Sequence, residues 1–146
     1  MTADPETGLV VRRLVPVARE RVFAAWLDPA SLATWMCPGP VVRTEVELDP
    51  RVGGKFRILM RKPDGAVEHT GEYLAIEPPA RLQFTWISEN TDRLPSVVTV
   101  ELLERGTGTE IVLTHRRLPA AKVDGHRQGW TDIVRKLGEA LAGPHA

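Results

Sequence analysis

The feature that most constrains the fold is the regular spacing of turn signals between residues 41 and 116. Short segments rich in β-branched and aromatic residues alternate there with runs of Pro, Gly, Asp and Asn. Parallel strands would need crossovers of about a dozen residues or more, which these connections do not provide. The pattern therefore predicts six antiparallel strands joined by short turns. They cover residues 41–48, 54–61, 67–77, 81–88, 96–104 and 109–116.

The N-terminal part predicts one more strand, followed by two short helices. Residues 9–17 are rich in β-branched side chains, which favours a seventh strand. In residues 18–27, apolar side chains recur four apart, which is the spacing of one helical face. Asp28 and Pro29 supply a cap and a first-turn proline for a second helix up to Trp35, set at an angle to the first.

The C-terminal part predicts a long amphipathic helix of about four turns, ended by Gly143-Pro144. Its apolar stripe consists of Trp130, Ile133, Val134, Leu137 and Leu141. A curved antiparallel sheet has to cover its apolar face, and this helix is the only predicted element long enough to do so. We therefore expect the helix to lie along the sheet.

Length, charge and cysteine content narrow the class of protein. The 146 residues have the length of one domain, and no internal repeat or change of composition divides them; we expect residues 1–8 and 143–146 to be loosely ordered tails. The 19 Lys and Arg residues balance the 19 Asp and Glu residues, which argues against a nucleic-acid partner. Neither a signal peptide nor an apolar run long enough to span a membrane is recognisable, and the single cysteine cannot form an internal disulfide. We expect a cytoplasmic protein, either a monomer or a homodimer.

Five segments, which together extend over nearly the whole chain, resemble the family of activator-of-heat-shock-protein-ATPase homologues within the START-like, or SRPBCC, superfamily. They are residues 18–38, 47–60, 71–86, 109–115 and 129–141. The resemblance implies an α+β helix-grip fold. In this fold a seven-stranded curved antiparallel sheet wraps around a long C-terminal helix, two short helices lie between the first and second strands, and a cavity between sheet and helix often holds an apolar ligand. Ala75 departs from the resemblance, because many such relatives carry glutamate there.

The glycine pair in "RVGGKFRIL" does not form a nucleotide-binding loop. A phosphate loop of the form G-x-x-x-x-G-K-[ST], aligned on Gly54-Lys55, would need glycine at Asp49 and a hydroxyl at Phe56. The alternating segment after the glycines predicts a strand, so no helix N-terminus follows to receive a phosphate. We interpret the pair as a turn or bulge at a strand entrance, with Lys55 pointing outward and Phe56 inward.

Reactive and metal-binding side chains show no motif that predicts catalysis. Cys37 has no base near it in the sequence and is interpreted as a packed loop residue. The histidines His69, His115, His126 and His145 lack the close spacing of a zinc site, although two or three of them could converge at one end of the cavity. We therefore predict neither a metal nor a cofactor, and we favour structural or ligand-orienting roles for the histidines.

The strand carboxylates do not suggest a catalytic pair either. Glu45 and Glu47 alternate with apolar positions and are expected to face water, and Glu72 and Glu101 have no recognisable acid partner. The nucleophile pattern G-x-S-x-G is also missing. The sequence does not exclude an enzyme, but it does not predict one.

The aromatic and methionine residues suggest a small-molecule site, because ligand pockets are mostly apolar with a few polar groups. The expected lining, with Tyr73, His69 or His115 available for a polar contact, is Trp35, Met36, Phe56, Ile58, Met60, His69, Tyr73, Phe84, Trp86, His115, Trp130 and Val134. Ordinary core packing is the alternative for each single residue. We expect a protein that binds an apolar or amphipathic ligand. The other hypotheses are a module that docks on a heat-shock chaperone and modulates its ATPase, and a polyketide cyclase-like pocket enzyme.

Overall fold

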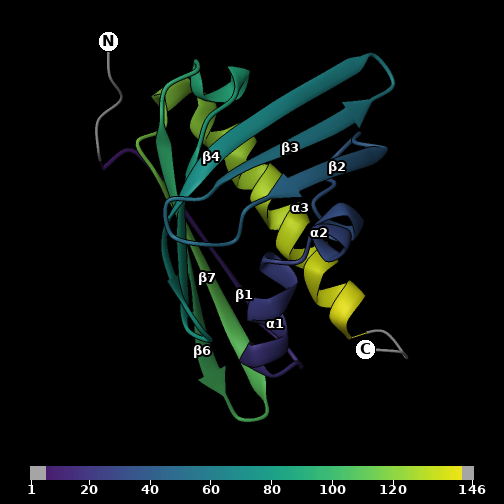
Figure 1. Ribbon diagram of the computed structural model, residues 1–146, viewed down its shortest axis with the longest axis vertical. Helices are drawn as coiled ribbons and strands as arrows, with labels where there is room; N and C mark the ends of the chain where they lie inside the picture. The colour runs from purple at the N-terminus through teal and green to yellow at the C-terminus, as the bar shows by residue number, and fades with distance from the viewer. Residues whose placement is uncertain (1–5, 143–146) are drawn as a thin grey trace.

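The computed structural model, which describes residues 6–142, contains one seven-stranded antiparallel sheet (Figure 1). The strand order is β1-β7-β6-β5-β4-β3-β2, so β1 and β2 form the two edges. All pairs of neighbouring strands are antiparallel, which confirms the predicted topology. The strands are β1 (Gly8–Val15), β2 (Arg43–Leu48), β3 (Lys55–Lys62), β4 (Gly65–Glu77), β5 (Arg81–Trp86), β6 (Ser96–Arg105) and β7 (Gly108–Arg116).

The helices confirm the predicted order of elements. Two short helices, α1 (Arg19–Trp26) and α2 (Pro29–Trp35), follow β1, and α3 (Val123–Leu141) closes the described chain. Figure 1 shows α3 running diagonally along the sheet, with α1 and α2 beside it. Two 3-10 turns, η1 (Glu89–Thr91) and η2 (Ala120–Lys122), complete the structure.

The C-terminal helix is longer than the sequence predicts. It begins at Val123 and has 19 residues, or about five turns rather than four. The residues of the predicted stripe are buried up to Leu137, and Leu141 is half-buried at the end. The additional turn precedes Trp130 and contains glycine, histidine and charged residues, so it adds little to the apolar pattern.

Alternating strand residues build the core beneath the sheet. In β3, Phe56, Ile58 and Met60 are buried, whereas Lys55 is exposed, as predicted. Aromatic rings fill the interior, with Phe56 edge-on to Phe84 at a centroid distance of 5.5 Å. Trp26 and Trp35 pack edge-to-face at 4.8 Å and join the two short helices to this core.

The glycine pair lies in the predicted turn between β2 and β3. Gly53 has a φ of +84°, and its N–H donates to Tyr73 O over 2.9 Å. The N–H of Gly54 donates to Arg51 O over 2.8 Å, so both amides are occupied by backbone carbonyls and are unavailable to a phosphate. An added Cβ at Gly54 would lie only 2.1 Å from Asp49 O, which makes glycine necessary there.

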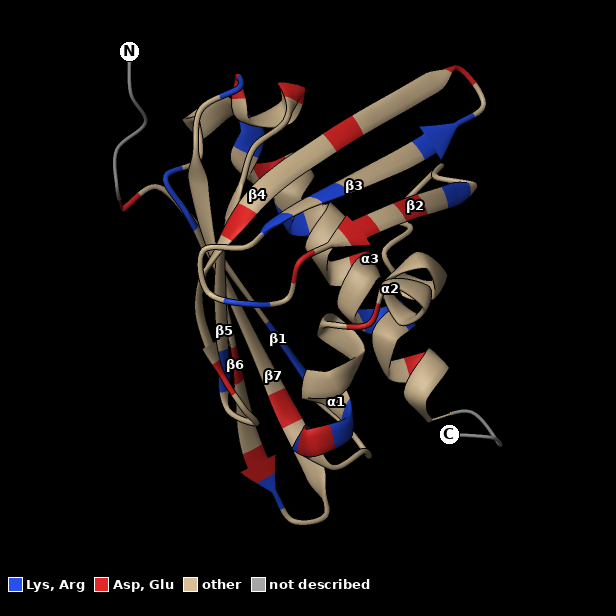
Figure 2. Ribbon diagram, in the orientation of Figure 1, with Lys and Arg blue, Asp and Glu red and all other residues tan. Residues whose placement is uncertain are grey.

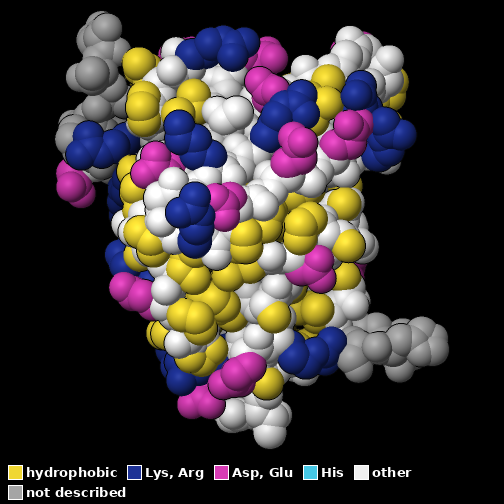
Figure 3. Space-filling view, in the orientation of Figure 1, with side chains coloured by type: hydrophobic (Ala, Val, Ile, Leu, Met, Phe, Trp, Pro, Cys, Tyr) yellow, Lys and Arg dark blue, Asp and Glu magenta, His cyan; other side chains and the backbone are white. Residues whose placement is uncertain are grey.

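Charged residues of both signs alternate along β2, β3 and β4 (Figure 2), and several of them form ion pairs. Arg61 and Arg43 both contact Glu45, and Arg57 contacts Glu68. The hydrogen bond from Arg61 is the largest of the effects that lower the pKa of Glu45 to about 2. Glu45 and Glu47 have side-chain exposures of 40% and 75%, which confirms that they face water. In Figure 3, charges of both signs are interspersed around apolar side chains.

The ends of the chain lie partly outside the described residues. Residues 1–5 and 143–146 are outside. They include most of the expected N-terminal tail and the whole expected C-terminal tail, with the predicted helix end at Gly143-Pro144 and His145. Within the described part, Gly8 already belongs to β1, and Thr7 O accepts a hydrogen bond from the Leu118 N–H over 3.1 Å. No helix between residues 6 and 142 is long and apolar enough to cross a membrane.

Candidate ligand-binding groove

A groove of about 560 Å³ opens between the N-terminal half of α3, the β3–β4 hairpin and the loop that follows α2. This volume lies within the range of small-molecule sites, roughly 300–1,000 Å³. The loop contributes residues 38–41, and the far wall comes from residues 121–133. From the sheet the lining takes Met60, Lys62, Val67, His69 and Trp86, and from η1 it takes Asn90.

Two indoles form the apolar floor of the groove. The rings of Trp86 and Trp130 have centroids 5.1 Å apart, and both side chains are buried. The His69 imidazole stacks on Trp86 at 4.5 Å. The strand register explains the neighbouring wall, because Met60 is paired with Val67 and paired residues present their side chains on the same face.

Two glycines on α3 leave open space on the side of the groove that this helix forms. Gly125 and Gly129 are four residues apart and both line the groove. A Cβ added at Gly125 would meet nothing within 4 Å, and one at Gly129 would meet only Pro38 Cβ at 3.9 Å. Glycine within a helix is less favourable than alanine by up to about 1 kcal/mol, and Gly125 lies in the first turn of α3 and Gly129 in the second. No packing contact requires glycine at these two positions. Their effect on the structure is that they leave space in the groove that a larger side chain would occupy.

A buried hydrogen-bond chain supports the floor from behind. Trp130 Nε1 donates to Nδ1 of His115 over 2.9 Å, and His115 Nε2 lies 2.7 Å from Ser96 Oγ. An indole N–H can only donate, so Nδ1 is the acceptor and the neutral imidazole carries its proton on Nε2. The Ser96 hydroxyl then donates to Trp86 O over 2.5 Å. The chain thus connects the two floor residues through β6 and β7.

Burial keeps the histidines around the groove neutral. Desolvation lowers the pKa of His115 to about 2, and the nearby His126 adds to this effect. Desolvation also lowers the pKa of His69 to about 4, against a hydrogen bond to Ile58 O that acts in the opposite direction. The pKa of His126 is lowered by burial as well, and its Nδ1 lies 2.8 Å from Lys122 O. A carbonyl oxygen only accepts, so that proton is on Nδ1.

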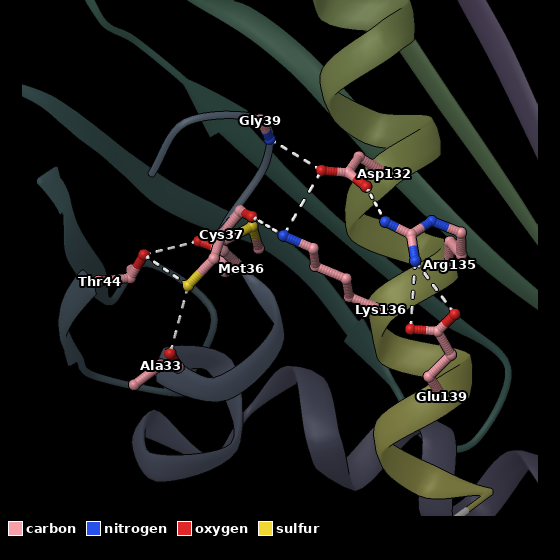
Figure 4. Close-up of polar contacts among 9 residues, drawn as sticks. All are labelled: Ala33, Met36, Cys37, Gly39, Thr44, Asp132, Arg135, Lys136 and Glu139. Carbon is pink, nitrogen blue, oxygen red and sulfur yellow. Dashed lines mark hydrogen bonds and ion pairs between the residues drawn. The ribbon is translucent and has the colours of Figure 1, made fainter. Parts of the chain in front are cut away.

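Polar contacts from α3 hold the loop that forms one rim of the groove (Figure 4). The Gly39 N–H donates to Asp132 Oδ2 over 2.8 Å, and Lys136 Nζ donates to Cys37 O. Asp132 also pairs with Arg135 and with Lys136. The bond from Gly39 is the largest of the effects that lower the pKa of Asp132. Side chains from one helix thus set the position of the rim.

Cys37 packs at the start of this loop, as the sequence suggests. Its Sγ lies 3.2 Å from Thr44 Oγ1 and 3.5 Å from Ala33 O (Figure 4). The Thr44 hydroxyl donates to Met36 O over 2.7 Å. No histidine nitrogen contacts this sulfur within the described residues, and no group of three or more His, Cys, Asp or Glu in residues 6–142 could hold a metal ion.

Beneath the sheet, buried apolar side chains form a packed core. A void there, lined by residues of α1, α2 and the sheet, measures about 10 Å³, which is room for roughly one water molecule. Trp26 Nε1 borders this region and is one of two buried side-chain donors without a hydrogen-bond partner in the described part of the chain. Trp86 borders both the void and the groove.

The structure divides the twelve residues expected at the site into three sets. Four of them line the groove: Met60, His69, Trp86 and Trp130. Five others border the small void and belong to the packed interior: Met36, Phe56, Ile58, Tyr73 and Phe84. The remaining three are buried and line neither space: Trp35, His115 and Val134. Burial raises the pKa of Tyr73 to about 12.

Several groove residues were absent from the sequence-based set. The loop 38–41 gave no signal of its own, because its role depends on a contact with Asp132 in α3. Lys62 did give a signal, since it continues the inward alternation of β3 one step beyond Met60. Gly125 and Gly129 also gave a signal, because two glycines about one turn apart are unusual in a helix.

The fold and the groove define a helix-grip protein, in which an antiparallel sheet packs along a long C-terminal helix. The family model described as "Activator of Hsp90 ATPase homolog 1-like protein" matches residues 16–142, and the chain belongs to this family. No curated protein matches the sequence.

Solved structures share the fold over almost the whole chain. Protein CV1439 from Chromobacterium violaceum is 22% identical with a TM-score of 0.82, and the match covers 92% of this chain and 96% of that protein. A protein from Rhodobacter sphaeroides is 25% identical with a TM-score of 0.80, covering 96% and 97%. An HSP90 activator from Plasmodium falciparum is 24% identical with a TM-score of 0.75, covering 93% and 96%.

Proposed function

We propose that the protein binds an amphipathic small molecule in the groove beside the N-terminal half of α3. The observation that carries this proposal is the open space above the Trp86 and Trp130 indoles, bordered by Gly125 and Gly129. The helix gives up stability at two positions where a methyl group would fit, and a ligand is a physical reason for keeping that space free.

The lining supports an amphipathic rather than a purely apolar ligand. Indole and thioether groups form the floor and adapt to varied shapes. Polar side chains border the same space, among them Asn90, Gln128 and His126. A few polar groups around an apolar surface are typical of sites that orient a small molecule.

Thermal-shift screening of lipids and aromatic metabolites tests the proposal. A ligand present at a hundredfold excess over Kd should stabilise the protein by about 2.7 kcal/mol. In the variant Gly125→Leu, the new side chain fills open space, so we expect the protein to fold and the ligand-induced shift to disappear. Ala140→Leu adds the same side chain at an exposed position of the same helix and should retain the shift. If no compound raises the melting temperature, or Gly125→Leu responds like the parent protein, the proposal fails.

A second candidate function is docking on a heat-shock chaperone. The family description, which refers to activation of the Hsp90 ATPase, favours it. A direct test measures the steady-state ATPase rate of the Hsp90 from the same cell, with and without a stoichiometric excess of this protein. A reproducible rise in the rate would support a co-chaperone role, and an unchanged rate together with no co-elution would exclude it.

A further inference from the structure

We propose that the groove selects anionic amphiphiles, whose carboxylate, sulfonate or phosphate group is held between Lys62 and Lys122. This inference rests on the proposed ligand-binding function and adds the charge class of the ligand. Its basis is the placement of two unpaired cations on opposite sides of one apolar floor.

Lys62 reaches the groove from the sheet. The inward positions of β3 are Phe56, Ile58 and Met60, and the next inward position is Lys62, at the end of the hairpin. Its side chain is half-buried, although lysine at a hairpin end is usually free to extend into water. The alkyl stem can therefore lie along the apolar wall while the ammonium remains at the rim.

Lys122 approaches from the other side, at the end of η2 and directly before α3. Its side chain is also half-buried, and its charge lies close enough to His126 to disfavour protonation of that ring. Lys122, His126 and Lys62 all line the groove, so the two lysines carry positive charge to the same pocket from different elements.

No carboxylate in the described residues neutralises these two lysines. Neither Lys62 nor Lys122 takes part in an ion pair between residues 6 and 142. The one acidic residue that lines the groove is Asp132, and it is already engaged by the Gly39 N–H, Arg135 and Lys136. Lys136, the lysine of α3, is likewise occupied, because its ammonium donates to Cys37 O and pairs with Asp132. The two ammonium groups thus place positive charge without an acidic partner on the lining of the groove.

An anionic head group with an apolar body matches this arrangement. The anion would meet two ammonium groups at the rim, where ionic hydrogen bonds are stronger than neutral ones. The body would lie against Trp86 and Trp130. A cationic amphiphile would meet like charge at the same rim, so charge, and not only shape, should decide which ligands bind.

Isothermal titration calorimetry with three matched probes tests the inference. The probes are 1-naphthaleneacetate, its neutral amide, and 1-naphthylmethylammonium, which share an aromatic body and differ in charge. The carboxylate should bind more tightly than the amide, and the ammonium compound most weakly. Replacing Lys62 or Lys122 by Gln should weaken carboxylate binding by about fivefold each, the change that corresponds to a partly exposed charge pair of about 1 kcal/mol. The affinity for the amide should stay the same.

Lys55→Gln is the matched control, because Lys55 belongs to the same strand but is exposed on the opposite face. It should leave all three affinities unchanged. Equal affinities for carboxylate and amide, or a Lys62→Gln/Lys122→Gln double variant that binds the carboxylate like the parent protein, would overturn the anion site while the groove remains a binding site. Binding of none of the three probes, together with no hit in the thermal screen, would overturn the proposed function and the anion site with it.

Discussion

Trp130 donates its indole N–H to Nδ1 of His115 over 2.9 Å, and this bond joins the floor of the groove to the interior of the sheet. His115 is fully buried on β7, and its other nitrogen contacts Ser96 on β6. The orientation of the groove floor therefore depends on a polar chain whose members His115 and Ser96 lie outside the groove lining. Such chains fix a geometry only when every donor and acceptor in them is paired.

Removing Ser96 from this chain should destabilise the fold. The variant Ser96→Ala leaves the Nε2–H of His115 buried without an acceptor and Trp86 O without its hydroxyl donor. We expect a loss of about 1–3 kcal/mol in the free energy of unfolding, measured with urea. Thr131→Ala removes an exposed hydroxyl that bonds only to Arg127 O, and should change stability by less than about 0.5 kcal/mol. Equal effects of the two variants would contradict the assigned role of the chain.

Stability should fall as the pH drops below about 6.5. The unfolded chain binds protons at His69 and His115 near a pKa of 6.5, whereas burial holds their folded pKa values near 4 and 2. Below 6.5 the unfolded state therefore binds more protons, and each histidine should reduce stability by about 1.4 kcal/mol per pH unit. Urea unfolding between pH 7.5 and 5 measures this slope above the range of the carboxylates.

The variant His69→Phe provides the control for this pH dependence. Phenylalanine preserves the ring stacked on Trp86 and removes one titrating group, while His115 and His126, whose pKa values burial also lowers, remain. The slope below pH 6.5 should decrease by about 1.4 kcal/mol per pH unit, which is the contribution of one histidine. An unchanged slope would show that His69 is protonated equally in the folded and unfolded states.

The sequence predicted those features that depend on local periodicity. The alternation of Phe56, Ile58 and Met60 identified the inward face of β3, and the stripe from Trp130 onward identified the buried face of α3. It could not separate a filled core from an open groove, because both are lined by the same kinds of side chain. For example, Phe56 packs against Phe84 in the core. Met60, four residues further along the same strand, lines the groove.

The rim of the groove was beyond sequence reasoning for a different reason. Gly39 and Asp132 are 93 residues apart, and their hydrogen bond depends on how α3 lies relative to the loop after α2. No periodic pattern encodes such a contact. Two other groove residues could have been predicted from the sequence. Lys62 is a charged residue at an inward position of a strand, and Gly125 is a glycine in a helix.

Removing the rim contact should loosen the loop selectively. Asp132→Ala deletes the acceptor of the Gly39 N–H and two ion pairs, and we expect a loss of about 1–2 kcal/mol in stability. Hydrogen exchange at the Gly39 amide should accelerate at the same time, because its partner is gone. Glu139→Ala removes only an exposed pair with Arg135 and should change stability by less than about 0.5 kcal/mol. Unaltered exchange at Gly39 in Asp132→Ala would rule out this role for the carboxylate.

Two glycine-to-alanine variants should have opposite effects on stability, because one glycine is required by contact and the other is not. At Gly71 in β4, an added Cβ would lie 2.0 Å from Thr85 O and 2.4 Å from the Phe56 ring, so Gly71→Ala should destabilise the protein by about 2 kcal/mol or more. At Gly125 in α3, a Cβ meets nothing within 4 Å, and Gly125→Ala should stabilise by about 0.5–1 kcal/mol. Thermal and urea unfolding of both variants measure the difference. A destabilising Gly125→Ala would mean that the helix needs glycine for packing, and the open wall of the groove would then lose its functional explanation.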